Sequence, residues 1–217
     1  MLRRSYLALH LFAAGELDLR IKKRKIMPDD LNILLSEMDN LWSNFTNCRA
    51  HFPALDKNLI GQTKVPSQLY YVKRGFNVTL LFNQPINQQK YDKMRSIGHW
   101  INQNFIIRLS ALMESYQIYS DKIGIDYDLD GSHLANLLRR LRNRFAHSSG
   151  KFNPGSHKDV EILKLMNEHL GLHKTVENRT EFPLDIDIIL KPLFKGCKKY
   201  VEEKIRIAEQ ANTADRL

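Results

Sequence analysis

The spacing of apolar residues along the chain predicts a protein built mainly from helices. The first pattern follows Pro28-Asp29-Asp30, where proline and carboxylates suit the start of a helix, and it predicts a helix over about residues 29–48. Its apolar positions, three and four residues apart, are Leu31, Leu34, Leu35, Met38, Leu41, Trp42 and Phe45. A longer helix is predicted between about residues 87 and 120, where no proline occurs and apolar residues follow one face.

Three further helices are predicted in the second half of the chain. They cover residues 132–147, about 156–170 with Gly171 as the stop, and a final stretch that Asp185 or Asp187 opens. Pro192 either kinks this final helix or marks its first turn.

The region between the first two helices has no helical period. Residues 49–68 contain Pro53, Gly61 and Pro66 and are expected to form a loop. Residues 69–82 are rich in Tyr, Val, Phe, Thr and Leu and predict a small β-hairpin that turns at Arg74-Gly75. The expected fold is therefore all-α, a bundle of about five helices with a small β-hairpin.

The length of 217 residues allows one sizeable domain with its own core. We expect that domain to cover residues 27–209, with a basic leader over 1–26 and a frayed tail over 210–217. The leader imitates the charged and apolar regions of a signal peptide, but His10 interrupts the apolar stretch and residues 22–25 are all basic.

Cysteine usage and hydropathy indicate a cytoplasmic protein. Cys48 and Cys197 show no spacing typical of a disulfide framework or a zinc site, so both are expected to be reduced. No apolar stretch approaches the roughly 20 residues that cross a bilayer, so no membrane partner is expected. The chain carries 33 Lys and Arg against 24 Asp and Glu, a net charge of +9 that favours polyanions such as nucleic acid as partners.

The most specific chemistry lies at the end of the helix predicted over residues 132–147. Its last turns read Arg142-Asn143-Arg144-Phe145-Ala146-His147, followed by Ser148-Ser149-Gly150. The apolar positions of this helix fall within about a third of its circumference and predict a face turned to the core; they are Leu134, Leu137, Leu138, Leu141 and Phe145. Asn143 and His147, four residues apart, are neighbours on the opposite side.

Arg142 and His147 are five residues apart and therefore diverge by about 140° on a regular helix. The two side chains can reach one phosphate only if the helix loosens near residues 148–150, or if a second copy of the helix supplies the missing half. A histidine in a last helical turn also suits the negative end of the helix dipole, and exposed arginines are typical of a solvated face, so these residues alone leave both interpretations open.

Other catalytic motifs are absent from the sequence. There is no P-loop, GxGxxG, HExxH or GxSxG motif. His169 and His173 are four residues apart, but they have no third ligand nearby and Gly171 separates them, so neither a metal site nor a cofactor is expected.

The segment from Arg142 to His147 resembles the R-x4-6-H signature of the HEPN superfamily, which consists of small helical-bundle domains. Arg142 matches the arginine, Asn143 the polar residue that often follows it, and His147 the histidine. The resemblance covers about residues 87–207 in architecture and implies an RNase that needs no metal and cleaves RNA to leave a 2′,3′-cyclic phosphate. It also implies a homodimer in which two signature helices face each other, here through residues 132–147.

The resemblance assigns roles that suit the residue types. His147 would transfer protons, because histidine titrates near neutrality, while Arg142 holds the scissile phosphate and Asn143 orients the histidine or donates to the phosphate. Arg139, Arg140 and Arg144 would bind RNA phosphates. Glu114, from the preceding long helix, and Ser148 are supporting candidates, and for Glu114 an ion pair with an arginine is the favoured role.

Three functions remain open on this basis. The first is an endoribonuclease acting on RNA, and the second is a non-catalytic HEPN-like domain that binds RNA, a nucleotide or a protein partner and uses the helix only to dimerise. The third is a toxin or phage-defence effector that a cognate antitoxin protein holds inactive, which concerns regulation more than chemistry.

Overall fold

The computed structural model describes residues 28–52, 57–66, 79–120, 123–148 and 150–214. Within these residues the chain forms five α-helices, two short strands and two shorter helical turns. They are α1 (Pro28–His51), η2 (Lys57–Leu59), β1 (Lys64–Pro66), β2 (Thr79–Leu81), α2 (Gln88–Ser115), α3 (Ser132–Ser148), α4 (His157–Leu170), η3 (Ile186–Leu190) and α5 (Lys191–Ala214). The predicted all-α bundle with a small hairpin is confirmed. The predicted basic leader lies outside the described residues.

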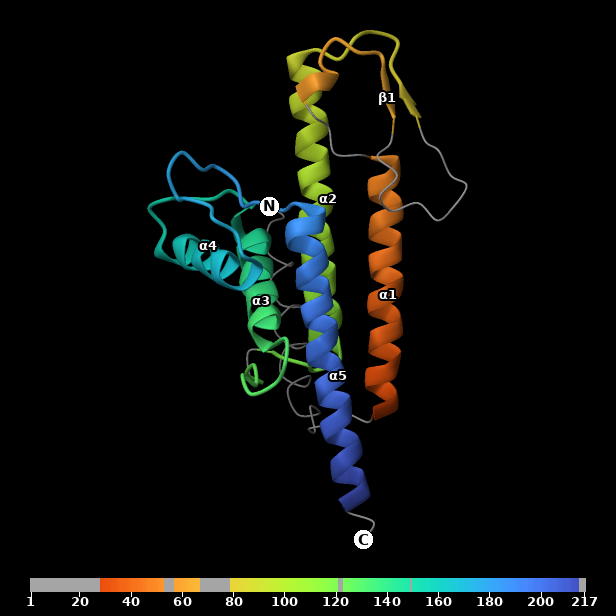
Figure 1. Cartoon of the computed structure of the whole chain (residues 1–217), viewed down its shortest axis with the longest axis vertical. Helices are drawn as coiled ribbons and strands as arrows, with labels where there is room; N and C mark the ends of the chain where they lie inside the picture. Colours follow the sequence, from red (N-terminus) through yellow and green to blue (C-terminus); the bar gives the residue numbers. More distant parts are fainter. Residues whose placement is uncertain (1–27, 53–56, 67–78, 121–122, 149, 215–217) are drawn as a thin grey trace, which may run out of the picture.

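Four of the helices form an antiparallel bundle. Helices α1 and α3 run in one direction, and α2 and α5 run in the other (Figure 1). Helix α1 packs against α2 and α5, and α3 packs against the same two helices. No helix among the described residues is long and apolar enough to cross a membrane.

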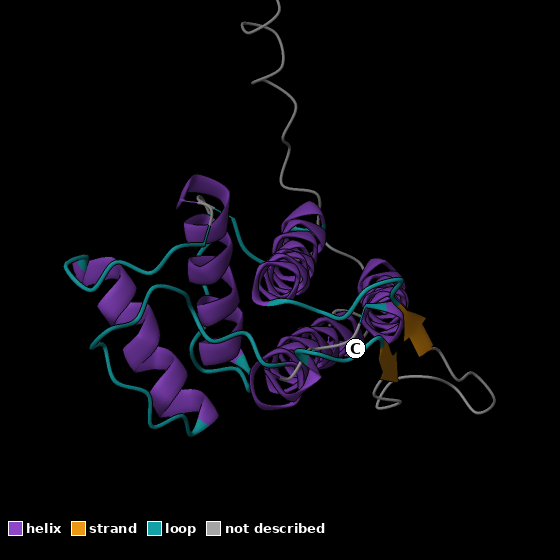
Figure 2. Cartoon of the chain, turned by 90° about the horizontal axis from the view of Figure 1, so that it is seen from above, coloured by secondary structure: helices purple, strands orange, loops and turns teal. Residues whose placement is uncertain are grey.

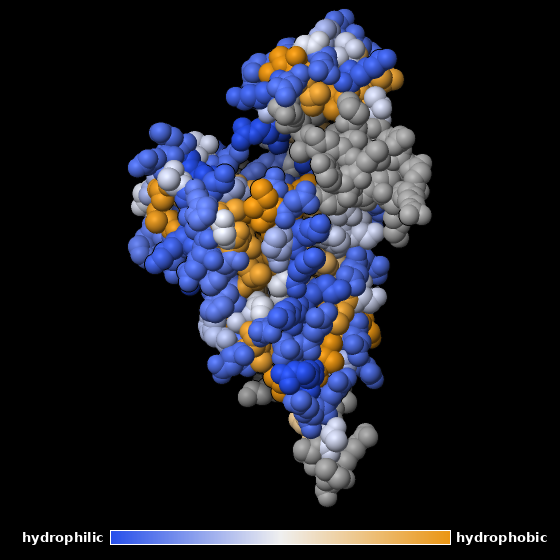
Figure 3. Space-filling model, viewed as in Figure 1, coloured by the Kyte–Doolittle hydropathy of each residue, from blue (hydrophilic) through white to orange (hydrophobic). Residues whose placement is uncertain are grey.

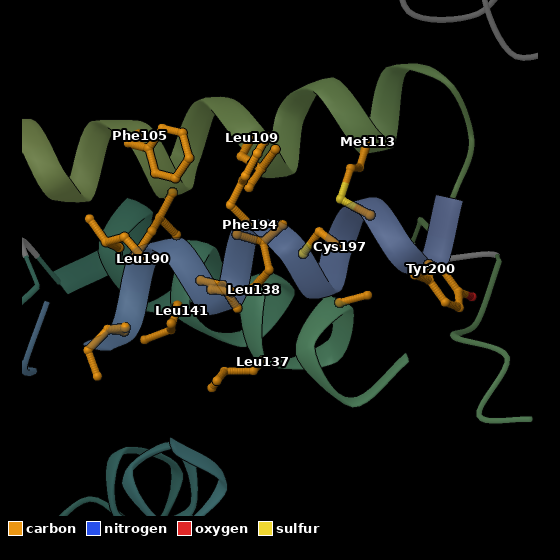
Figure 4. Packing of buried hydrophobic residues seen from close by; sticks show 14 of the residues in the cluster. Phe105, Leu109, Met113, Leu137, Leu138, Leu141, Leu190, Phe194, Cys197 and Tyr200 are labelled. Atoms are coloured by element: carbon orange, nitrogen blue, oxygen red, sulfur yellow. The ribbon is translucent and has the colours of Figure 1, made fainter. Parts of the chain in front are cut away.

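The core lies where α2, α3 and α5 meet. Leu137, Leu138 and Leu141 of α3 are buried with no exposed surface, as the predicted apolar face requires. Leu138 and Leu141 face apolar side chains of η3, α5 and α2 (Figure 4), whereas Leu137 lies on the side of α3 away from α5. The core residues of these elements include Phe105, Leu109, Met113, Leu190, Phe194, Cys197 and Tyr200. Aromatic rings extend this core toward α1, where Trp42 stacks on Phe194 with ring centroids 4.9 Å apart.

Helix α4 and the hairpin lie on opposite sides of the bundle (Figure 2). Helix α4 begins after its N-cap Ser156, packs against α3, and stops at Gly171, as the sequence predicted. Gly171 caps the helix with a left-handed φ of 64°. The surface seen in Figure 3 is largely hydrophilic, with apolar residues confined to small patches.

The hairpin differs from its prediction in its first strand. Strand β1 lies at Lys64–Pro66, inside the stretch expected to be a loop, and pairs antiparallel with β2 at Thr79–Leu81. The proline that suggested a loop ends a three-residue strand, where the missing N–H is tolerated. The predicted turn at Arg74-Gly75 lies outside the described residues.

The final helix begins as a π-helical turn and continues as an α-helix. Asp185 caps it, because its Oδ1 accepts hydrogen bonds at 3.0 Å from the backbone N–H groups of Asp187 and Ile188. Pro192 is the second residue of α5 but the seventh of the helical stretch that begins at Ile186. It therefore lies inside this stretch, just after the π-helical turn, and not in its first turn. Helix α5 continues to Ala214, five residues beyond the predicted end of the domain.

The loop before η3 contacts both the segment that follows α3 and helix α2. Phe152 N–H donates to the Thr180 carbonyl at 2.9 Å, and Glu181 forms an ion pair of 3.0 Å with Arg95 of α2. His99, one helical turn from Arg95, has a buried Nε2 without a hydrogen-bond partner among the described residues. Burial lowers the pKa of His99 below 6.5, Glu181 raises it and Arg95 lowers it.

We predict that His99 makes the folded state less stable in acid. Because the folded protein favours neutral His99, the unfolded chain takes up the proton first as the pH falls below 6.5, and stability is lost over that range. Replacing it, as in His99→Gln, should reduce the fall in unfolding free energy between about pH 7.5 and pH 5.5. Urea unfolding at both pH values measures this effect, with the exposed His157→Gln as the control. Equal pH dependence in wild type and His99→Gln would contradict the prediction.

Candidate functional site

The rotation of α3 about its axis decides which residues of the signature reach the surface. The buried face of Leu138, Leu141 and Phe145 fixes this rotation against the core. As a result, Asn143 and His147 are exposed on the opposite side, and Arg142 lies between the two faces with 32% of its side chain exposed. The predicted division of the hexapeptide into an anchoring Phe145 and outward Asn143 and His147 is confirmed.

Arg142 is held by two neighbours. Its Nη2 lies 3.2 Å from Oε2 of Glu114 on α2, and its Nη1 donates to Oδ1 of Asn143 at 2.9 Å. The pairing of Glu114 with an arginine was predicted, and the partner is Arg142. Since Oδ1 of Asn143 accepts from Arg142, the amide Nδ2 of Asn143 is turned away from the guanidinium group.

Helix α3 stays helical through both ends of the signature. It ends at Ser148, one residue after His147, so the divergence of about 140° between Arg142 and His147 applies to one copy of the helix. In this structure the helix does not loosen before His147, so the two side chains of one chain do not converge. The second predicted route, a second copy of the helix, stays a prediction. Ser148, the other supporting candidate, is the last residue of α3.

The chain turns sharply just beyond the signature. Gly150 is buried and has a φ of 71°, a left-handed conformation in which a side chain is strained. A Cβ at this position would also collide with the side chains of Gln103 on α2 and Phe145 on α3. The chain just after α3 therefore packs closely against the Gln103 side chain of α2.

The three predicted RNA-binding arginines lie in different environments. Arg139 donates to Oδ1 of Asn136 at 3.4 Å and is half-buried. Arg140 forms an ion pair of 2.9 Å with Glu161 of α4, with side chains 35% and 39% exposed. An exposed pair of this kind contributes roughly 0–1 kcal/mol, so Arg140 can exchange it for a phosphate at little cost.

Arg144 is instead bound to a buried carboxylate. Its Nε and Nη2 lie 2.7 Å from Oδ1 and Oδ2 of Asp159 on α4, and the Asp159 side chain has no exposed surface. Oδ2 of Asp159 also accepts the backbone N–H of Asn153 at 2.8 Å. The arrangement gives Arg144 a structural role in joining α3, α4 and the loop between them, while its contact with RNA stays a prediction.

Glu114 is connected to the core by two residues, Ser110 and Tyr119, that were not predicted as part of the site. Ser110 Oγ donates to Oε1 of Glu114 at 3.4 Å and lies 2.8 Å from the hydroxyl of Tyr119. Ser110 and Tyr119 are both fully buried. The spacing of Ser110 and Glu114 by four residues on a predicted helix was a usable signal. Tyr119 lies beyond the end of α2, so no helical spacing related it to Glu114.

The described residues contain no group of three or more His, Cys, Asp or Glu side chains that could hold a metal ion. His133 and His169 are stacked with ring centroids 4.6 Å apart, at the opposite end of α3 from the signature.

Comparisons of the chain with protein-family models, curated proteins and solved structures gave no match. Among the described residues, those at the C-terminal end of α3 therefore form the candidate site.

We predict that Asp159 and Glu161 contribute very differently to stability, although both pair with an arginine of α3. Asp159→Asn removes the buried charge beside Arg144 and puts an amide N–H against a donor of Arg144 or of Asn153, because both carboxylate oxygens face donors; this should cost about 3 kcal/mol of unfolding free energy. Glu161→Gln breaks an exposed pair and should cost about 1 kcal/mol or less. Denaturant unfolding compares the two variants, and equal losses would contradict the assignment of Arg144 as structural.

Proposed function

We propose that this protein is a metal-independent endoribonuclease of the HEPN type, with a site shared between two copies of α3. The observation that carries the proposal is the state of the signature: Arg142 is held by Glu114 and Asn143, and His147 is exposed one residue before the helix ends. A partly exposed guanidinium group that is held in one orientation suits a phosphate site, because its remaining donors can bind the phosphate oxygens.

The geometry of α3 supports the sharing. Within one chain, Arg142 and His147 point about 140° apart on a continuous helix. Two copies packed about a two-fold axis place the same residues on both sides of the interface, so Arg142 of one copy can face His147 of the other. The homodimer through α3 belongs to the proposal for this reason.

The proposed reaction uses two side chains of the signature, His147 and Arg142, together with solvent water. His147 takes the proton of a ribose 2′-hydroxyl, the 2′-oxygen forms a bond to phosphorus, and the bond from phosphorus to the 5′-oxygen breaks. The 5′-oxygen takes a proton from water, and the protonated His147 returns a proton to the hydroxide that forms, which leaves a 2′,3′-cyclic phosphate and a 5′-hydroxyl. Arg142 offsets the charge that develops on the phosphate oxygens.

Arg142 keeps donors for the substrate while it is held. A guanidinium group has five N–H donors, and the contacts with Glu114 and Asn143 use Nη2 and Nη1 once each. The outward Nδ2 of Asn143 adds a donor beside it. Among the predicted RNA-binding residues, Arg139 and Arg140 are better suited to phosphates along the backbone than Arg144, which Asp159 engages.

We predict that the purified protein cleaves RNA in the presence of EDTA. His147→Ala and Arg142→Ala should each lower the cleavage rate by at least about a hundredfold, because proton transfer and charge stabilisation are typically worth that much. Gel analysis of a labelled RNA, with detection of the cyclic phosphate end, measures the reaction. Growth of the expressing host, with and without the protein of a neighbouring gene, tests the proposed toxin role and antitoxin partner.

Matched controls are available on the same fold. His133→Ala removes an exposed histidine from the other end of α3, and Arg206→Ala removes an exposed arginine from α5; both should keep wild-type cleavage. If wild type cleaves no tested RNA, or if His147→Ala stays active, the proposed reaction is wrong, and the non-catalytic binding or dimerisation domain becomes the better account.

A further inference from the structure

We infer that Glu114 is a positioning residue of this site, at the end of a hydrogen-bonded chain that begins in the core at Tyr119. The inference rests on the proposed function, because it concerns how Arg142 is aimed at the phosphate. Its basis is a connected set of contacts from Tyr119 through Ser110 and Glu114 to Arg142.

The donors and acceptors define a direction along this chain. A carboxylate only accepts hydrogen bonds, so Ser110 is the donor in its contact of 3.4 Å with Glu114. A serine hydroxyl has one hydrogen, so Tyr119 must be the donor in its 2.8 Å hydrogen bond with Ser110. The chain therefore runs from the Tyr119 hydroxyl to Ser110 Oγ and on to Oε1 of Glu114.

Tyr119 is a permanent donor at the start of the chain. It is fully buried, and burial raises the pKa of its hydroxyl far above the ordinary range, with a smaller lowering from the hydrogen bond to Ser110. The charges of Glu114 and Arg142 also act on Tyr119, with opposite sign. The proton of the phenol thus stays in place over the pH range in which RNA can be handled.

Glu114 connects this hydrogen-bonded chain to the guanidinium group of Arg142. Oε1 contacts Ser110 and Oε2 contacts Nη2 of Arg142 at 3.2 Å, so both carboxylate oxygens are engaged and rotation about the last bond of Glu114 is restricted. Arg142 is then fixed on its second nitrogen by Asn143. The remaining N–H donors of the guanidinium group are presented in one orientation.

The other arginines of α3 lack this combination. Arg144 is held by a buried carboxylate, but at a junction of α3 with α4. The carboxylate that holds Arg140 belongs to Glu161 and is 39% exposed. Arg139 contacts the amide of Asn136 and not a carboxylate. Of the four arginines, Arg142 is the one that combines partial exposure with a carboxylate tied to buried hydroxyl groups, as a preorganised phosphate ligand requires.

The test compares Glu114→Ala, Glu114→Gln and Ser110→Ala in the full chain by steady-state cleavage of RNA. Glu114→Ala should lower kcat roughly tenfold, because a hydrogen bond to a charged group is lost, and leave KM unchanged or lower, because a negative charge near the RNA is removed. Glu114→Gln keeps an acceptor for Arg142 and should recover most of kcat. Ser110→Ala keeps the ion pair and should give an intermediate kcat.

A second measurement does not depend on cleavage. The guanidinium nitrogen signals of Arg142 in a ¹⁵N NMR spectrum, identified by their loss in Arg142→Ala, should be sharp and separate in wild type because rotation is restrained. They should collapse in Glu114→Ala and broaden in Ser110→Ala. Asp39→Asn, which breaks the 2.8 Å pair with Lys198 between α1 and α5, is the matched control and should leave them unchanged.

The two measurements separate the possible failures. Unchanged Arg142 signals and unchanged kcat in Glu114→Ala would overturn the inference, as would an equal effect of Asp39→Asn. Unchanged Arg142 signals in Ser110→Ala would overturn the link from Glu114 to the core. If Glu114→Ala does not fold, the Ser110→Ala spectrum alone tests the inference, and unchanged signals there would overturn it. A wild-type protein that cleaves no RNA refutes the proposed function, whereas the NMR comparison still decides whether Glu114 orients Arg142.

Discussion

The burial of one face of α3 against α2 and α5 is the constraint on which the rest of the structure depends. Leu137, Leu138 and Leu141 have no exposed surface, and Phe145 extends the same face to the end of the helix. Each fully buried leucine contributes on the order of 2 kcal/mol, so rotation of α3 about its axis is strongly disfavoured. That fixed rotation sets Arg142 beside α2 and leaves Asn143 and His147 in solvent.

The charged residues of α3 follow from the same rotation. Toward α4 the helix presents Arg140 and Arg144, which meet Glu161 and the buried Asp159. Toward α2 it presents Arg142, which meets Glu114. The four arginines of the helix thus differ in role: Arg144 builds the fold, Arg140 forms an exposed pair, Arg139 contacts Asn136, and Arg142 lies at the candidate site. Composition alone would treat all four alike.

Much of the fold could be predicted from the sequence because its helices are amphipathic and well capped. The leucine spacing of α3, the stop at Gly171 and the start at Pro28 are local signals, and the structure confirms them. Strand β1 could not be predicted, because three residues ending in a proline carry no period. The buried pair of Arg144 and Asp159 joins residues fifteen positions apart in two helices, and no local pattern reports such packing.

The most direct test of the central claim, a site shared between two copies of α3, is complementation between inactive variants. In a mixture of His147→Ala and Arg142→Ala proteins, each mixed dimer regains one site that combines an intact Arg142 from one chain with an intact His147 from the other. Half of the dimers are mixed and each has one of two sites, so the account predicts about a quarter of wild-type RNA cleavage after subunit exchange. Cleavage no greater than that of either variant alone would contradict it.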